Sequence, residues 1–203
     1  MLYNPFKWNF IKILSNPVRS ATHRYLAEFK CTPKTAGAET VHDYITLLAD
    51  PQTVTTGFKT IDLARPILIT KKLQSVAGNV KLYGTDILGR SITETISLPT
   101  GATTIESTKA FKSVTKADLP AYTTEEDWIK IGTVNKIGLP ALFYEDRIVL
   151  TIFDKAQIAH IGTYSKSDIA LNILTPIKGG AVATFNDTKE LIVIFIPCYE
   201  EEA

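Results

Sequence analysis

Residues 79–98, NVKLYGTDILGRSITETISL, contain two strand patterns separated by a turn. In the second pattern the apolar residues Ile92, Ile96 and Leu98 alternate with threonine and serine, which is the period of a strand with one buried face. The turn contains Asp86 and Gly89, which favour tight turns through local hydrogen bonding and access to positive φ. This stretch therefore predicts an antiparallel hairpin.

Short β-branched segments of the same kind recur along the chain after residue 51. We expect further strands at residues 67–70, 107–115, 129–134, 147–153, 168–174, 181–185 and 191–196. Segments 147–153 and 191–196 are almost continuously apolar, so we expect central strands that are covered on both faces. Regular short strands without long helices predict an all-β fold, a β-sandwich or jelly-roll-like domain, with a barrel as the nearest alternative.

A change in composition near Pro51 divides the chain into two expected regions. Residues 1–50 are interpreted as an extended N-terminal arm, and residues 51–203 as the β-sandwich domain. Within the arm, residues 41–48 place apolar side chains on one helical face, so a possible short helix is expected there.

The first part of the arm interleaves aromatic and basic side chains and is interrupted by prolines. Such a segment can pack on its own domain, contact a partner protein, or bind nucleic acid by stacking and charge. Partner contact is favoured over nucleic acid because the basic residues are spaced apart, unlike a phosphate-binding patch. The candidate partner-binding residues are Tyr3, Phe6, Lys7, Trp8, Phe10, Lys12, Arg19 and Arg24.

Composition is that of a globular protein, with 203 residues, 45% hydrophobic content and a formal net charge of +1. The low net charge removes the general argument for a nucleic-acid binder. No segment approaches the about 18 apolar residues of a membrane span, and no secretory signal is convincing. Cys31 and Cys198 lack the spacing of a zinc site or a disulfide framework, so we expect free thiols and a protein assembled in a reducing cytoplasm.

No recognised catalytic, cofactor or metal motif occurs in the chain. His23, His42 and His160 are scattered, and phosphate-binding and nucleophile motifs are lacking. We therefore expect no enzymatic activity, no cofactor and no metal. Residues 125–127 are interpreted as a solvated loop in preference to a metal site, and residues 84–90 as a hairpin turn in preference to an anion-binding nest.

A polysaccharide-cleaving function would need two carboxylates at a set separation. Candidate acids are Asp62, Glu94, Glu106 and Asp168, and the sequence places no two of them together. Trp8 and Trp128 are the two indoles available for stacking on a sugar. This interpretation therefore has weak support.

Several segments resemble virion proteins of tailed phages. They are Arg65-Pro66 before a strand, Gly84-Thr85-Asp86 with Gly89, Ile92-Thr93-Glu94-Thr95, KAFKSVT at residues 109–115, and the glycine-marked residues 131–140. The resemblance covers roughly residues 65–145 and contains strand and turn patterns. It implies a small β-sandwich virion component of the capsid decoration or stabilising type, a head auxiliary protein, without catalysis.

The same resemblance implies partners and a location. The partners would be the major capsid protein and copies of the chain itself in a homo-oligomer, with a trimer favoured, and neither nucleic acid nor membrane. The location would be the virion. Alternatives are a neck or tail connector, or a head-fibre, receptor-binding or carbohydrate-binding module. Such a module would expose aromatic side chains near Tyr122, Trp128 and Tyr144.

Charge is distributed unevenly between the two ends of the chain. Four basic residues precede the first acid, Glu28, whereas residues 200–202 are all glutamate. We expect the basic arm to meet an acidic surface, such as residues 200–202 of an adjacent copy. Deleting residues 1–30 would then abolish particle binding and leave a folded domain.

Overall fold

The structure is a computed structural model that describes residues 11–13, 27–143 and 146–196, the first of these ranges by its backbone alone. Within these ranges the chain forms sixteen strands and one short 3-10 helix, η1 (Ile169–Leu171). The expected all-β fold is confirmed. No helix in the described ranges is long and apolar enough to cross a membrane.

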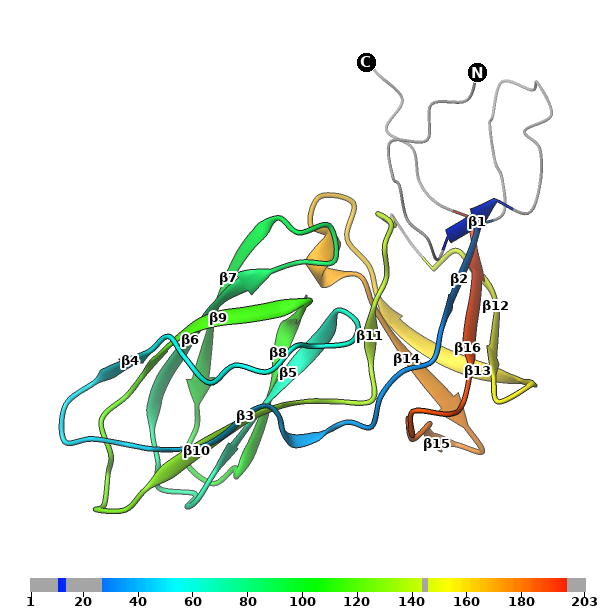
Figure 1. Cartoon of the computed structure of the whole chain (residues 1–203). Coiled ribbons are helices and arrows are strands. Elements are labelled where there is room, and N and C mark those ends of the chain that lie inside the picture. The colour runs from blue at the N-terminus through cyan, green and yellow to red at the C-terminus, as the bar shows by residue number, and fades with distance from the viewer. Residues whose placement is uncertain (1–10, 14–26, 144–145, 197–203) are drawn as a thin grey trace.

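The first body of the structure is built from β3 (Gly37–Thr46), β4 (Gln52–Val54), β5 (Arg65–Lys71), β6 (Gly78–Thr85), β7 (Ser91–Leu98), β8 (Thr104–Phe111), β9 (Ser113–Leu119) and β10 (Trp128–Thr133). They form two four-stranded antiparallel sheets with the orders β3-β10-β5-β8 and β4-β9-β6-β7 (Figure 1). Counted along this body, the orders are first-eighth-third-sixth and second-seventh-fourth-fifth. This eight-strand arrangement is a jelly roll.

Alternating side chains of the two sheets form the core of the jelly roll. Val41, Ile69, Leu82 and Ile129 are among its fully buried members. The predicted hairpin is β6–β7, paired without interruption from Gly78 opposite Leu98 to Thr85 opposite Ser91.

The hairpin turn has the local chemistry expected from the sequence. The Asp86 carboxylate accepts hydrogen bonds from the backbone N–H groups of Leu88 and Arg90, at 2.7 and 3.0 Å. Gly89 has a φ of 78°. The interpretation of residues 84–90 as a turn is confirmed.

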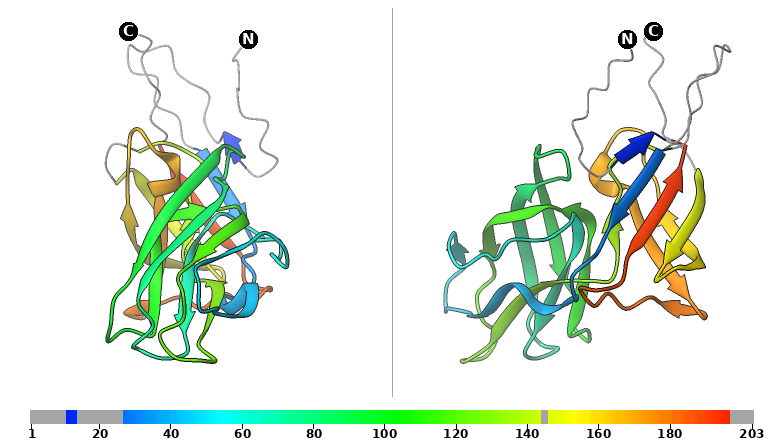
Figure 2. Two further views of the ribbon diagram at one scale, coloured as in Figure 1. Left: turned by 90° about the vertical axis from the view of Figure 1, so that its left-hand side faces the viewer. Right: turned by 45° about the vertical axis from the view of Figure 1, so that its right-hand side comes forward.

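The second body contains β1 (Ile11–Ile13), β2 (Ala27–Cys31), β11 (Ile137–Gly138), β12 (Ile148–Phe153), β13 (Ala156–Thr163), β14 (Ile173–Lys178), β15 (Ala181–Val182) and β16 (Leu191–Phe195). They form one eight-stranded sheet in the order β1-β2-β16-β12-β13-β14-β11, with β15 on β14. Phe29 near one edge and Ile137 at the other share a core, so the sheet curves around it (Figure 2).

The jelly roll is inserted into the second body. The chain completes β2, passes through all eight strands of the jelly roll, and returns at β11 (Figure 1). β2 then lies beside β16, the last described strand of the chain. β12 and β16 are interior strands as predicted, although one face of each is only partly covered.

The possible short helix at residues 41–48 is wrong. These residues belong to β3 as far as Thr46, where Ile45 pairs with Ile129 of β10. Val41 is fully buried in the jelly-roll core. A 3.6-residue pattern over a few residues is weak, and sheet pairing with packing overrode it.

Two segments of the expected arm are strands, residues 27–31 as β2 in the second body and residues 37–46 as β3 in the jelly roll. The division of the chain at residue 50 stays a prediction. The strand expected at residues 168–174 instead begins with η1, because the Asp168 side chain accepts from the N–H of Ala170 and caps that turn. The sheet resumes at Ile173.

Gly132 is needed for the pairing of β10 with β3. A Cβ on Gly132 would overlap the carbonyl oxygen of Gly37 and the backbone of Ala38. We expect Gly132→Ala to lower the free energy of unfolding by about 2–4 kcal/mol, measured by urea denaturation, because two paired backbones must separate.

Gly37→Ala is the matched control for this substitution. Its added Cβ would meet the Thr40 methyl group at 3.7 Å, an ordinary contact. We expect a change within about 1 kcal/mol. Equal urea midpoints for the two variants would contradict the prediction.

Candidate functional site

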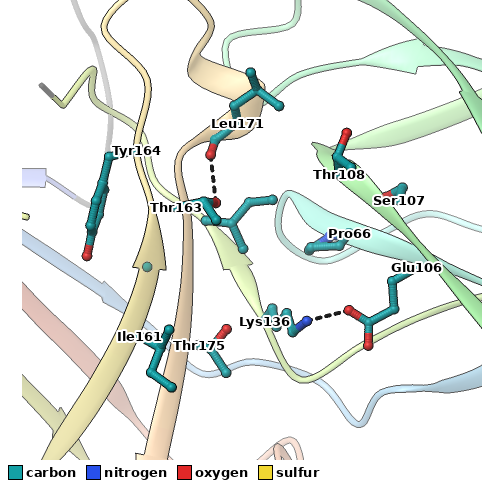
Figure 3. A pocket seen from close by; sticks show the side chains of 12 residues that line it. Pro66, Glu106, Ser107, Thr108, Lys136, Ile161, Thr163, Tyr164, Leu171 and Thr175 are labelled. Atoms are coloured by element: carbon teal, nitrogen blue, oxygen red, sulfur yellow. Dashed lines mark hydrogen bonds and ion pairs between the residues drawn. The ribbon is translucent and has the colours of Figure 1, made fainter. Parts of the chain in front are cut away.

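A pocket of about 430 Å³ lies between the jelly roll and the second body (Figure 3). Pro66 of β5 and residues 106–108 of β8 line it on the jelly-roll side. Ile161 of β13 and Thr175 of β14 line it on the other side. Its volume is that of a ligand pocket, and junctions between bodies are a common position for such pockets.

The pocket is mainly apolar, and most of its polar groups already have partners. The Thr163 hydroxyl donates to the carbonyl of Leu171 at 2.9 Å. The Lys136 ammonium forms an ion pair with the Glu106 carboxylate. Ile161 is 65% exposed, which leaves an apolar wall open. This chemistry fits an apolar or amphipathic occupant better than a reacting group.

Arg65, the first residue of β5, connects the elements that hold the pocket walls. Its side chain is fully buried. Nη2 donates to the Asp62 carboxylate at 2.7 Å and to the carbonyl of Lys34 at 2.8 Å. The guanidinium carbon lies 5.1 Å from the centre of the Phe185 ring. Arg65 thus links the jelly roll, the second body and the crossing segment, which is residues 32–36 between β2 and β3.

Further contacts fix the same junction. The N–H of Asp187 donates to the carbonyl of Pro33 at 3.2 Å, and the Asp187 carboxylate accepts from the N–H of Thr35. The N–H of Phe185 donates to the Asn135 side chain at 3.1 Å. A buried cluster also joins the two bodies and shares Ile173 with the pocket wall; it consists of Ala64, Ile87, Ala110, Ile169 and Ile173.

Cys31 lies beside this junction and is a free thiol. Burial raises the pKa of this thiol to about 12, with the Arg65 charge opposing the shift. A thiol with such a pKa is protonated and unreactive at neutral pH. Cys198 lies outside the described residues.

A second surface feature is the outer face of the curved sheet. Ladder partners point to the same side of a sheet, and Leu150 pairs with Ile194, Ile152 with Ile192, and Ala159 with Ile177. The residues between them point inward to the core. The outer face therefore carries Leu150, Ile152, Ala159, Ile161, Ile177, Ile192 and Ile194, half-buried or exposed, with Glu28, Lys30 and Gln157 as their polar ladder partners on the same side.

Most predicted site residues lie outside the described part of the chain. These are Tyr3, Phe6, Lys7, Trp8, Phe10, Arg19 and Arg24, together with the side chain of Lys12. The backbone of Lys12 belongs to β1 and pairs with Glu28 of β2. Their role in partner binding stays a prediction.

The two described histidines have local partners. His42 contacts the carbonyls of Asp43 and Thr56, and His160 lies 3.1 Å from the Asp146 carboxylate. Within residues 27–143 and 146–196, no three His, Cys, Asp or Glu side chains gather as a metal site would need. His23 lies outside these ranges.

Each candidate acid has a structural partner. Asp62 holds Arg65, Glu94 accepts from the backbone N–H groups of Thr108 and Lys109, and Asp168 forms an ion pair with Lys109. In the acidic run, Asp127 is buried and accepts from the N–H groups of two threonines, so this residue is a turn cap and not solvated.

The aromatic residues expected to mark a carbohydrate site are partly covered where they are described. Tyr122 packs against the jelly-roll core, and Trp128 is half-buried with the Lys130 ammonium 4.8 Å from its ring centre. Tyr144 lies outside the described residues. These two side chains do not form an open stacking platform.

No protein-family model, no curated protein and no solved structure matches this chain. The site therefore has to be interpreted from its own chemistry. Glu106 was a candidate acid in the sequence, but the pocket itself was not predicted, because its walls come from strands that are distant in the chain.

Replacing Arg65 should loosen the junction. Arg65→Leu leaves the carbonyl of Lys34 and the Asp62 carboxylate without their guanidinium partner, and removing one member of a buried pair costs about 3–5 kcal/mol. We expect a loss of this size in urea denaturation and faster proteolysis within residues 31–37.

The matched control is Arg90→Leu. Arg90 also pairs with an aspartate, Asp86, but its side chain is 54% exposed, so the loss should stay below about 1 kcal/mol. Similar losses for both arginine variants would show that Arg65 does not hold the junction.

Proposed function

We propose that the protein is a structural component of a virus particle. In this proposal it is a decoration or stabilising protein of a tailed phage. It binds the major capsid protein and copies of itself and has no catalytic role. The observation that carries the proposal is the aliphatic outer face of the curved sheet.

An antiparallel sheet with one face in water normally alternates apolar with polar side chains. The outer face departs from this rule on the neighbouring strands β12 and β16, where Leu150, Ile152, Ile192 and Ile194 are left half-buried, with polar side chains only at the flanking strands. Large exposed apolar patches on soluble proteins mark surfaces that another molecule covers. A protein that assembles into a lattice buries such a face in every copy.

The fold is compatible with this role. Jelly rolls occur in viral capsid proteins, and also in lectins and cupins, so the fold alone is an analogy. The resemblance of residues 65–145 to phage virion proteins points in the same direction. The partly covered Tyr122 and Trp128 give a carbohydrate-binding role less support.

The expected effect of deleting residues 1–30 needs correction. That deletion removes most of β2, including Phe29, which is fully buried in the core of the second body. Such a chain would lose part of its core, so it would not retain a folded domain. A deletion that tests the arm therefore has to end at residue 10, before β1 begins.

The outer face can be tested with Ile194→Lys. Ile194 lies opposite Glu28, so the new ammonium gains a carboxylate neighbour and the fold should be retained. We expect the wild-type chain to sediment as an oligomer. The variant should dissociate into monomers at a tenfold or higher protein concentration, which corresponds to a loss of about 1.4 kcal/mol in the free energy of association.

Ser97→Lys, on the exposed side of β7, is the control and should sediment as wild type. A monomeric wild-type chain, or a variant that associates normally, would argue against an assembly role for this face. Copy number in purified particles then locates the protein: hundreds of copies support decoration, and a dozen supports a neck or tail role.

A further inference from the structure

We propose that the pocket between β8 and β13–β14 is the receptor for residues 6–10 of a neighbouring copy. This inference rests on the proposed function, because it names the contact through which copies would hold one another. The occupant would be the aromatic side chains of Phe6, Trp8 and Phe10.

The pocket has room for such an occupant. Its volume is about 430 Å³, and Ile161, Ile173 and Pro66 give it apolar walls. Ile161 is 65% exposed and pairs with Thr175, which also lines the pocket. Covering apolar surface of this kind stabilises a complex by about 25 cal/mol per Å², and aromatic side chains bring the most surface per residue.

The sequence of residues 6–10, FKWNF, fits an extended ligand. In an extended chain alternate side chains point to the same side, so Phe6, Trp8 and Phe10 would form one aromatic row. Lys7 and Asn9 would point to the other side. Tyrosine, tryptophan and arginine are frequent anchors at protein interfaces, and buried aromatic anchors carry most of the binding energy.

The pocket carries no net charge that would repel the segment. Glu106 and Lys136, which line it, form an ion pair with each other. Residues 1–27 contain basic residues and no acid. Lys7 would point away from the pocket, so the aromatic row makes the contact.

The strand directions favour a neighbour's segment over the chain's own. β1 pairs with Ile11 opposite Phe29 and Ile13 opposite Ala27, so the chain enters β1 from the Cys31 end of the sheet. The pocket lies at the opposite end, because ladder pairing brings the Thr163 end of β13 level with Phe195 and Ala27.

The distance across the sheet points the same way. Between β1 and β13 lie β2, β16 and β12, so the two strands are four steps apart, about 19 Å at about 4.8 Å per step. The chain's own residues 6–10 would have to reverse direction and cross this distance. A neighbouring copy has no such constraint.

Disulfide trapping between two full-length chains tests the inference. One chain carries Trp8→Cys and the other Ile161→Cys, both in a Cys198→Ser background, and the mixture is oxidised with glutathione disulfide. Cys31 should not react, because burial raises its pKa to about 12. We expect a cross-linked heterodimer, identified by mass spectrometry of the peptide pair that is joined at positions 8 and 161.

Val182→Cys is the matched control for Ile161→Cys. Val182 is an apolar strand residue, 46% exposed, that does not line the pocket. Cross-linking of Trp8→Cys to Val182→Cys at an equal rate, or no cross-link to Ile161→Cys, would overturn the inference. So would an intrachain cross-link in a dilute chain that carries both Trp8→Cys and Ile161→Cys.

A second measurement separates this inference from the proposed function. Trp8→Ala should weaken self-association at least tenfold in sedimentation, whereas Tyr3→Ala should change it less than threefold, because Tyr3 lies outside the row. If Ile194→Lys prevents association while Trp8→Ala does not, the assembly role stands and the pocket inference fails.

Discussion

The structure depends on the buried guanidinium of Arg65. One side chain joins the crossing segment at Lys34, the loop at Asp62 and the ring of Phe185, three positions that lie far apart in the chain. Among the described residues, its Nε and Nη1 have no hydrogen-bond partner, an uncommon cost for buried polar atoms. Burial lowers the pKa of this group, and the Asp62 carboxylate opposes the shift. The arrangement therefore combines the cost of two unpartnered nitrogen atoms with contacts that hold three separate segments together.

Local features of the fold were predictable from the sequence because local chemistry determines them. The β6–β7 hairpin follows from alternation and from Asp86 and Gly89, which act within a few residues of one another. The strand at residues 37–46 was mistaken for a possible helix because its partner, β10, lies more than 80 residues later. Similarly, no local pattern indicates that β2 pairs with β16.

The candidate site was harder to predict than the strands. Pro66, Glu106, Lys136 and Ile161 are ordinary residues in their own segments, and they become a pocket only when the jelly roll docks on the curved sheet. The outer face was partly visible, since segments 147–153 and 191–196 are almost continuously apolar. This apolar pattern was interpreted as two central strands whose faces are both covered by other parts of the same chain. In the structure one face of each strand is only partly covered, and composition alone does not distinguish these two cases.

The insertion of the jelly roll also determines an order of folding during synthesis. All strands of the jelly roll have been made once Thr133 leaves the ribosome, so this body can close early. The second body cannot close then, because β2 must wait for β16, some 160 residues later, and such distant pairing is slow. Until then β2 can pair only with β1, and the edge that will join β16 stays open. The nascent chain therefore carries a two-stranded ribbon without its core through most of its synthesis, and the apolar side chain of Phe29 needs protection from wrong partners.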